Sequence, residues 1–242
     1  MRKHRLTIIA LLLSAVLCGS SVQAAAPSKY DIITDARARA VNSALEQSMQ
    51  YYRRETATIS TYNATQLNAL IEENKHLEVI AERDQCQFTP DIENRARLVH
   101  IPPFEYAWAD MLINGVCVKQ DINLGLSYLE SAMQHAYAPA LMRLSRFYET
   151  GFIVHENKDL AMAYMKTAAQ LGSSIARLNW ADMLVRGFGG PRQYEEAYRW
   201  LYSTHFSDLY LQEKSNYLQA ELEKRMPPNV TARARSYAAA FN

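Results

Sequence analysis

The feature that most constrains the fold of this chain is an internal repeat in its middle. Glycines recur at Gly115, Gly151 and Gly187, each 36 residues after the one before. The same shift superposes columns of small and aromatic side chains. A fixed period of this length is typical of solenoid proteins, in which each unit buries its apolar face only against its neighbours. The further matching columns are Gly125, Ala161 and Ala197, followed three residues later by Tyr128, Tyr164 and Trp200.

Each repeat unit reads as a pair of helices. In the second unit, Leu141, Leu144 and Tyr148 follow one another at helical spacing and form one apolar stripe. Gly151 then stands where this helix must stop, because a left-handed C-terminal cap favours a residue without Cβ. The stripe of the second helix starts at Ala161. A small residue in this column predicts a close approach of the paired helices, with the aromatic residue one turn later filling the remaining gap.

The sequence therefore predicts an all-α fold, an α-solenoid with additional helices at both ends. The three repeats are expected at about 104–137, 138–172 and 173–204. An N-terminal flank at 64–103 precedes them, and capping helices at 205–242 cover the open end.

The first 24 residues have the layout of a secretory signal peptide. Basic residues are followed by an apolar run and by small residues, and cleavage is expected after Ala24. Cys18 suggests a lipoprotein as the alternative, but Leu17 before it is too large for the usual cleavage motif. The mature chain then begins with an extension at 25–63, which is expected to be partly helical.

Removal of the leader leaves two cysteines, Cys86 and Cys117. An even pair in an exported protein suggests one disulfide. The loop that it would close has about 32 residues, which corresponds to about 3.5 kcal/mol of stabilisation through the unfolded chain. The alternatives are two buried free thiols or a metal site. A zinc site is disfavoured because neither cysteine belongs to a CxxC pair.

Charge and motif content exclude several classes of function. Without the leader, 23 Lys plus Arg stand against 25 Asp plus Glu, which is no basic footprint for nucleic acid. No apolar run reaches the roughly 20 residues of a membrane span. The glycine-rich stretch 187–190 lacks a following Lys-Ser or Lys-Thr, so it indicates a turn rather than a phosphate loop. No catalytic, cofactor-binding or metal site is predicted.

Polar residues within the repeats are interpreted as surface. Asp110 and Asp182 occupy one column with Arg146 between them, and we expect an exposed polar face there, with ligand contact as the alternative. His135 and His155 lie near expected helix ends, where solvated or capping roles are the default.

The repeat has a known counterpart. A helix pair of period 36, with glycine punctuation and Ala168-Ala169-Gln170-Leu171-Gly172 closing the second helix, resembles the Sel1-like repeat. That family is close to the tetratricopeptide repeats. The resemblance implies a stack of helix pairs that offers surfaces to other proteins.

A more specific pattern runs through about residues 64–228. It consists of an ordered set of short segments at 66–77, 83–87, 91–96, 115–118, 194–202 and 222–227. Together with the leader and the repeats, this set resembles the MotX family of periplasmic components of sodium-driven polar flagellar motors. Cys86 and Cys117 match the cysteine pair of that family. Two departures from the family are a longer extension at 25–63 and a less basic tail after Pro228.

The resemblance implies a non-enzymatic role at the flagellar basal body in the periplasm. Members associate with MotY in a ring that helps to hold the PomA/PomB stator, so the implied partners are a MotY-like T-ring protein and a PomB-like stator subunit. The partner-contact residues are unknown; the flank up to Cys117 is the expected docking region, and an amphipathic stretch at 31–55 is either a second docking segment or a solvated helix. The alternative function is a generic periplasmic adaptor built from Sel1-like repeats.

Overall fold

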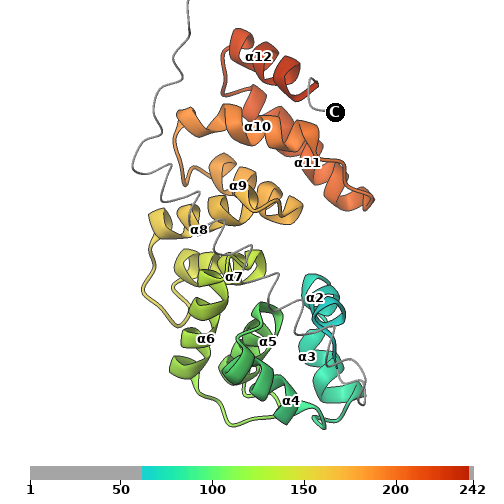
Figure 1. Ribbon diagram of the computed structural model, residues 1–242. Coiled ribbons are helices and arrows are strands. Elements are labelled where there is room, and N and C mark those ends of the chain that lie inside the picture. The colour runs from blue at the N-terminus through green and yellow to red at the C-terminus, as the bar shows by residue number, and fades with distance from the viewer. Residues whose placement is uncertain (1–61, 240–242) are drawn as a thin grey trace, which may run out of the picture. The chain divides into compact units, whose positions relative to one another are not determined.

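The computed structural model describes residues 62–239, and every regular element in this range is helical (Figure 1). The predicted all-α class is confirmed for this part of the chain. The leader at 1–24 and nearly all of the extension, with its amphipathic stretch, lie outside the described residues. The helices are α2 (Ala64–Glu72), α3 (His76–Glu78), α4 (Thr89–Asn94), α5 (Pro102–Asn114), α6 (Ile122–Gln134), α7 (Ala138–Thr150), α8 (Lys158–Gln170), α9 (Ser174–Val185), α10 (Tyr194–Ser203), α11 (Leu209–Glu223) and α12 (Pro228–Ala239). Two π-helical turns, η1 (Val79–Arg83) and η2 (Arg95–Val99), and a 3₁₀ turn, η3 (Pro191–Gln193), complete the set.

Three consecutive helix pairs, α5/α6, α7/α8 and α9/α10, form the repeats (Figure 1). The second helix of the first two pairs begins on an equivalent side-chain cap. Asp121 accepts a hydrogen bond from the backbone N–H of Leu124 at 3.0 Å, and Asn157 accepts one from Leu160 at 3.0 Å. Each cap satisfies a backbone donor that the first helical turn leaves without a partner. The two caps lie 36 residues apart, so the repeat extends to the capping residues.

The repeat glycines lie at the ends of the first helices. Gly115 (φ 68°) and Gly151 (φ 69°) follow α5 and α7 directly in the left-handed region. Gly187 (φ 89°) follows α9 after one more residue. The N–H of Phe188 then donates to the carbonyl of Met183 at 3.0 Å, which closes the helix in a Schellman motif.

Small residues allow the two helices of a pair to pack closely. A Cβ on Gly125 of α6 would lie 2.6 Å from Cγ1 of Ile113 and 2.9 Å from the carbonyl oxygen of Ala109, both on α5. In the equivalent column, Ala161 and Ala197 are fully buried. The first pair therefore packs more closely at this point than a methyl group would permit.

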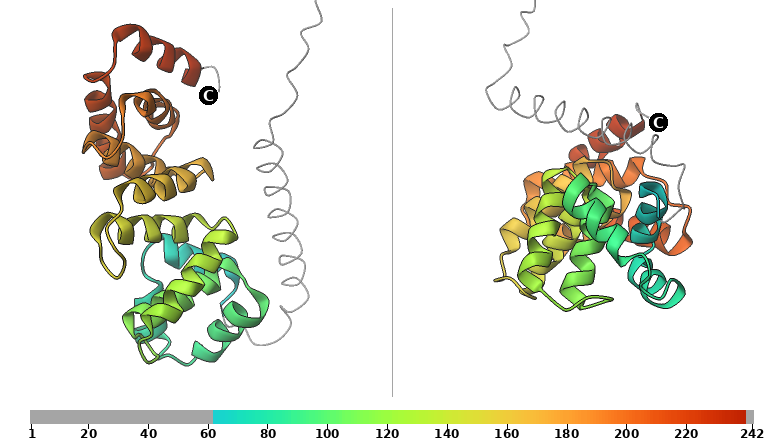
Figure 2. Two further views of the ribbon diagram at one scale, coloured as in Figure 1. Left: turned by 90° about the vertical axis from the view of Figure 1, so that its left-hand side faces the viewer. Right: turned by 60° about the horizontal axis from the view of Figure 1, so that its bottom comes forward.

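The flank packs directly on the first repeat. Helices α2, α3 and α4 and the turn η2 all contact α5. In both views of Figure 2 the blue-green ribbon of the flank lies beside the green ribbon of the first repeat. As a consequence, α5 is buried on almost every side, including its two carboxylates, Glu105 and Asp110. One hydrophobic core runs from the flank into the first two repeats.

A second core joins the later repeats to the last two helices. Leu218 and Leu222 of α11 are buried in it. Arg225 donates to the carbonyl of Val185 at 2.6 Å and so satisfies the end of α9. Helix α12 lies against α10, where Arg233 pairs with Glu195 at 2.6 Å. These helices occupy the stretch at which capping helices were predicted.

Candidate functional site

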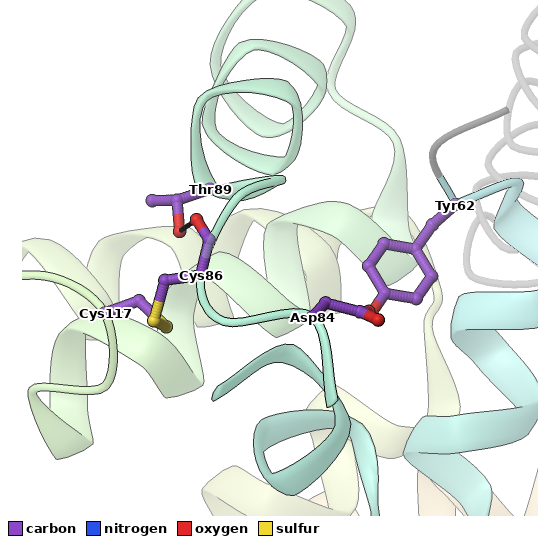
Figure 3. The surroundings of a disulfide bond; sticks show 5 residues. All are labelled: Tyr62, Asp84, Cys86, Thr89 and Cys117. Carbon is purple, nitrogen blue, oxygen red and sulfur yellow. Dashed lines mark hydrogen bonds between the residues drawn. A yellow bond between two sulfur atoms is a disulfide. The ribbon is translucent and has the colours of Figure 1, made fainter. Parts of the chain in front are cut away.

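The junction between the flank and the first repeat contains a disulfide and several buried carboxylates. Cys86, between η1 and α4, and Cys117, in the α5–α6 turn, form a disulfide with their Cα atoms 5.4 Å apart (Figure 3). The sequence left open a disulfide, two buried free thiols or a metal site for these cysteines, and the structure has the disulfide. Thr89 supports the flank side of the bond, because its hydroxyl donates to the carbonyl of Cys86 at 2.8 Å. The bond ties the flank to the first repeat.

A hydrogen-bonded group beside the disulfide anchors the start of the described chain. The hydroxyl of Tyr62 donates to Asp84 (Figure 3). Asp84 also accepts two hydrogen bonds from Arg83, at 2.8 and 3.0 Å. Burial and the hydrogen bond to Asp84 raise the pKa of Tyr62, and the hydrogen bond from Arg83 lowers the pKa of Asp84. These three residues also line an open groove of about 400 Å³, here called the N-terminal groove, together with Gln66, Ala69, Leu70 and Phe88.

The first buried carboxylate of α5 joins three elements. Glu105 is fully buried, and both of its carboxylate oxygens have hydrogen-bonding partners. Oε1 accepts from the hydroxyl of Ser131 at 2.7 Å and lies 3.0 Å from Nδ1 of His100, and Oε2 lies 2.9 Å from Nδ1 of His135. His100 follows η2 of the flank, whereas Ser131 and His135 belong to the end of α6 and its cap. A buried carboxylate with these partners fixes the flank against both helices of the first repeat.

The second buried carboxylate links the flank to the second repeat. Asp110 is 2 % exposed. Its Oδ2 lies 3.1 Å from Nε2 of His76 in the flank, and its Oδ1 pairs with Arg143 of α7 at 3.1 Å. The interpretation of Asp110 as exposed surface is therefore wrong, because the flank covers the side of α5 that stays open in an inner repeat. His135 caps the C-terminus of α6, one of the two roles expected for it, and its ring is in addition a partner of Glu105.

The same column stays partly open in the later repeats. Asp182 accepts from Arg186 at 2.9 Å, and Arg186 also pairs with Glu149 of α7 at 2.6 Å, which joins the second repeat to the third. Arg146 is exposed. Asp182, Arg186 and Glu149 thus form a surface ion-pair network.

The aromatic column lies between successive helices, and Tyr128, Tyr164 and Trp200 are all partly buried. The ring centroid of Tyr164 is 5.8 Å from that of Tyr148, and that of Trp200 is 5.0 Å from that of Trp180. Both contacts join the two helices of one repeat, α7 with α8 and α9 with α10.

Sequence reasoning missed the two buried carboxylates as anchors of the flank. One signal was available: Glu105 and Asp110 stand in a helix whose other residues are almost all apolar, from Phe104 to Ile113. A carboxylate inside such a segment needs buried partners. The partners are 5 to 34 residues away in sequence, so their identity required the tertiary structure.

Residues 62–239 contain no group of three His, Cys, Asp or Glu side chains placed to hold a metal ion. Within the same range, no helix combines the length and the apolar character that crossing a membrane requires.

Comparison with known proteins shows the family of the chain. The Sel1 repeat family matches residues 102–135, 138–173 and 174–203. The sodium-type polar flagellar protein MotX of Vibrio parahaemolyticus serotype O3:K6 (strain RIMD 2210633) is 41% identical over 179 residues, which cover 74% of this chain and 84% of that relative. The chain belongs to the MotX family. Among solved structures, a Sel1 repeat protein from Oxalobacter formigenes is similar with a TM-score of 0.44 and 16% identity, over 53% of this chain and 97% of that one.

Proposed function

We propose that this chain is a non-enzymatic scaffold of the polar flagellar motor in the periplasm. In this proposal it forms a ring at the basal body with a MotY-like protein and helps to anchor a PomA/PomB-type sodium-driven stator. The observation that carries the proposal is membership of the MotX family, with 41% identity to a sodium-type polar flagellar protein. Export through the leader at 1–24 is part of the proposal, because the motor partners named here meet in the periplasm.

The construction of the described chain supports a mechanical role. A component that holds a stator must transmit force without deforming, and it needs no reactive group. The disulfide, Glu105 and Asp110 tie the flank to the first two repeats through covalent, hydrogen-bonded and ionic contacts. Buried contacts of this kind resist local opening better than surface contacts do.

The flank up to Cys117 is the proposed partner-docking region. Leu98 in η2 is 65% exposed although the flank is small and otherwise buries its large apolar residues well. The N-terminal groove lies in the same flank and offers Leu70 and Phe88. An exposed apolar side chain and a groove with apolar lining residues both fit a protein partner that covers them.

The test is a clean deletion in the source organism, scored by swimming and by electron microscopy of filaments. Cells that keep filaments but do not swim support the proposal, because torque is then lost without loss of assembly. Cells without filaments would instead indicate a role in basal-body assembly. Normal swimming in the absence of any related gene would overturn the motor function and leave the generic Sel1-repeat adaptor.

Complementation with single variants locates the docking region. Leu98→Arg places a charge on the exposed flank, and Leu209→Arg is its control, because Leu209 is 80% exposed on α11. Both variants should fold normally. We expect Leu98→Arg to abolish co-purification with the MotY-like protein and swimming, and Leu209→Arg to keep both. Equal behaviour of the two variants would place the docking region elsewhere.

A further inference from the structure

The last three helices enclose a shallow cup of about 400 Å³ that the scaffold function does not use. It lies where α10, α11 and α12 meet, and its volume is within the range of sites for small organic ligands. Its lining consists of Tyr198 and Tyr202 from α10, Asn216, Gln219, Ala220 and Glu223 from α11, and Arg235 from α12.

One wall of the cup is an aromatic ring held in place from behind. Tyr202 is 43% exposed, and its ring is stacked on that of Tyr198, with centroids 5.9 Å apart and 25° between the planes. Tyr198 itself is buried. The ring of Tyr202 is thus oriented before any ligand arrives, and it offers a flat apolar surface.

Most of the other lining groups of the cup are polar, and the charged pair among them carries no net charge. Arg235 pairs with Glu223 and donates from Nε to the hydroxyl of Tyr198 at 2.8 Å, and that hydroxyl donates to Glu223. Burial and the hydrogen bond to Glu223 raise the pKa of Tyr198 to about 12, which keeps the hydroxyl neutral. The guanidinium and the carboxylate therefore neutralise and position each other, and the amides of Asn216 and Gln219 stand beside them.

We propose that this cup binds a neutral oligosaccharide, with one sugar ring stacked on Tyr202 and its hydroxyl groups bonded to the amides and to the Glu223–Arg235 pair. A sugar ring presents an apolar C–H face and a rim of hydroxyl groups that both donate and accept, which matches an oriented ring beside planar polar groups. A phosphate or a strongly charged peptide would find no net charge to bind. Asn216 accepts from Gln212 at 3.1 Å and Gln219 donates to Ser215 at 3.2 Å, so each amide keeps its other polar atom for the hydroxyl groups of a ligand. An apolar side chain would make no use of those atoms.

This inference is independent of the proposed motor function, because the cup and the flank are separate parts of the described chain. Its test uses the full mature chain with its disulfide intact. The probes are the β-1,4-linked tetramer of N-acetylglucosamine and, as an α-linked neutral comparison, maltotetraose, each titrated by calorimetry and by NMR.

We expect saturable binding of at least one saccharide. Tyr202→Ala should weaken it by about two- to tenfold, because stacking on an aromatic face contributes on that scale. Tyr202→Phe should keep it, since the ring face remains. Tyr217→Ala is the matched control, because Tyr217 is 61% exposed on α11 and lies outside the lining of the cup; its affinity should equal that of the wild type. Circular dichroism and thermal melts establish that each variant is folded.

Three results would overturn the inference. The first is the absence of saturation with both saccharides up to about 10 mM, the weak end of specific recognition. The second is equal saccharide affinity in folded Tyr202→Ala and in the wild type. Binding of an uncharged peptide that depends on Tyr202, without any saccharide binding, would also overturn it and make the cup a peptide site.

Discussion

The close packing of the first helix pair at Gly125 leads to a prediction in which two opposing effects can be weighed. Gly125→Ala in α6 adds a single methyl group at a helical position. On helix propensity alone this change stabilises a protein by about 1 kcal/mol, because glycine is a poor helix former. The added Cβ would, however, lie 2.6 Å from Cγ1 of Ile113 and 2.9 Å from the carbonyl oxygen of Ala109.

The identity of the second neighbour decides the sign. Ile113 can rotate its side chain, but the carbonyl of Ala109 belongs to the backbone of α5, so relief of that contact requires the two helices to separate. Overpacking of this kind costs typically about 1–3 kcal/mol, and α5 is buried on almost every side, which limits relaxation. We expect a net loss of about 1–2 kcal/mol, which for a chain of this size lowers the melting temperature by roughly 2–8 °C.

The assay is thermal unfolding of the oxidised mature protein followed by circular dichroism. Ala163→Gly calibrates propensity in the same protein, because Ala163 is exposed in α8 and its methyl group can be removed without opening the core. That variant should lose about 1 kcal/mol. A melting temperature of Gly125→Ala equal to or above that of the wild type would refute the reasoning, because propensity would then outweigh the contact between the helices.

Three further predictions concern the disulfide, the buried carboxylate and the buried tyrosine. Replacing Cys86 and Cys117 together by serine should lower the free energy of unfolding in guanidinium by about 3.5 kcal/mol, since the unfolded chain loses its closed loop. Asp110→Ala should cost about 3–5 kcal/mol in the same assay, because its buried partners lose their acceptor, whereas Asp182→Ala, in the same column but partly exposed, should cost less than about 1 kcal/mol. Burial raises the pKa of Tyr198 from 10.0 to about 12, so the folded chain holds the hydroxyl proton more tightly than the unfolded chain. The resulting stability is complete below about pH 10 and is lost as the pH rises toward about 12, and Tyr198→Phe should remove that part of the alkaline loss.

Each of these has a result that would contradict it. Equal gel mobility with and without reductant, together with two thiols open to alkylation, would contradict the disulfide. Equal losses in the two aspartate variants would mean that burial does not distinguish their positions. An unchanged alkaline profile in Tyr198→Phe would show that its hydroxyl does not govern the loss.

Local chemistry and periodicity determined the repeat architecture from the sequence. The 36-residue period, the glycines at Gly115, Gly151 and Gly187 and the small-residue column predict paired helices with left-handed ends, because each requirement acts within one unit or between neighbours. The family could be recognised from short sequence segments within about residues 64–228, and comparing such segments with known proteins needs no structure. The pairing of Cys86 with Cys117 was favoured by their even number and by the leader.

Only the tertiary structure decided how the flank is held and where polar groups are buried. Asp110 and Asp182 occupy one column of the repeat, yet Asp110 is buried and Asp182 is partly exposed. The flank covers Asp110 through His76, whereas Asp182 pairs with Arg186 at the surface. Glu105 likewise depends on histidines from two other elements. The periodic pattern describes what each unit requires of its neighbours. The flank is not part of the periodic pattern, and it packs on the first repeat. Residues in the same repeat column therefore have different roles, which depend on contacts between segments far apart in the chain.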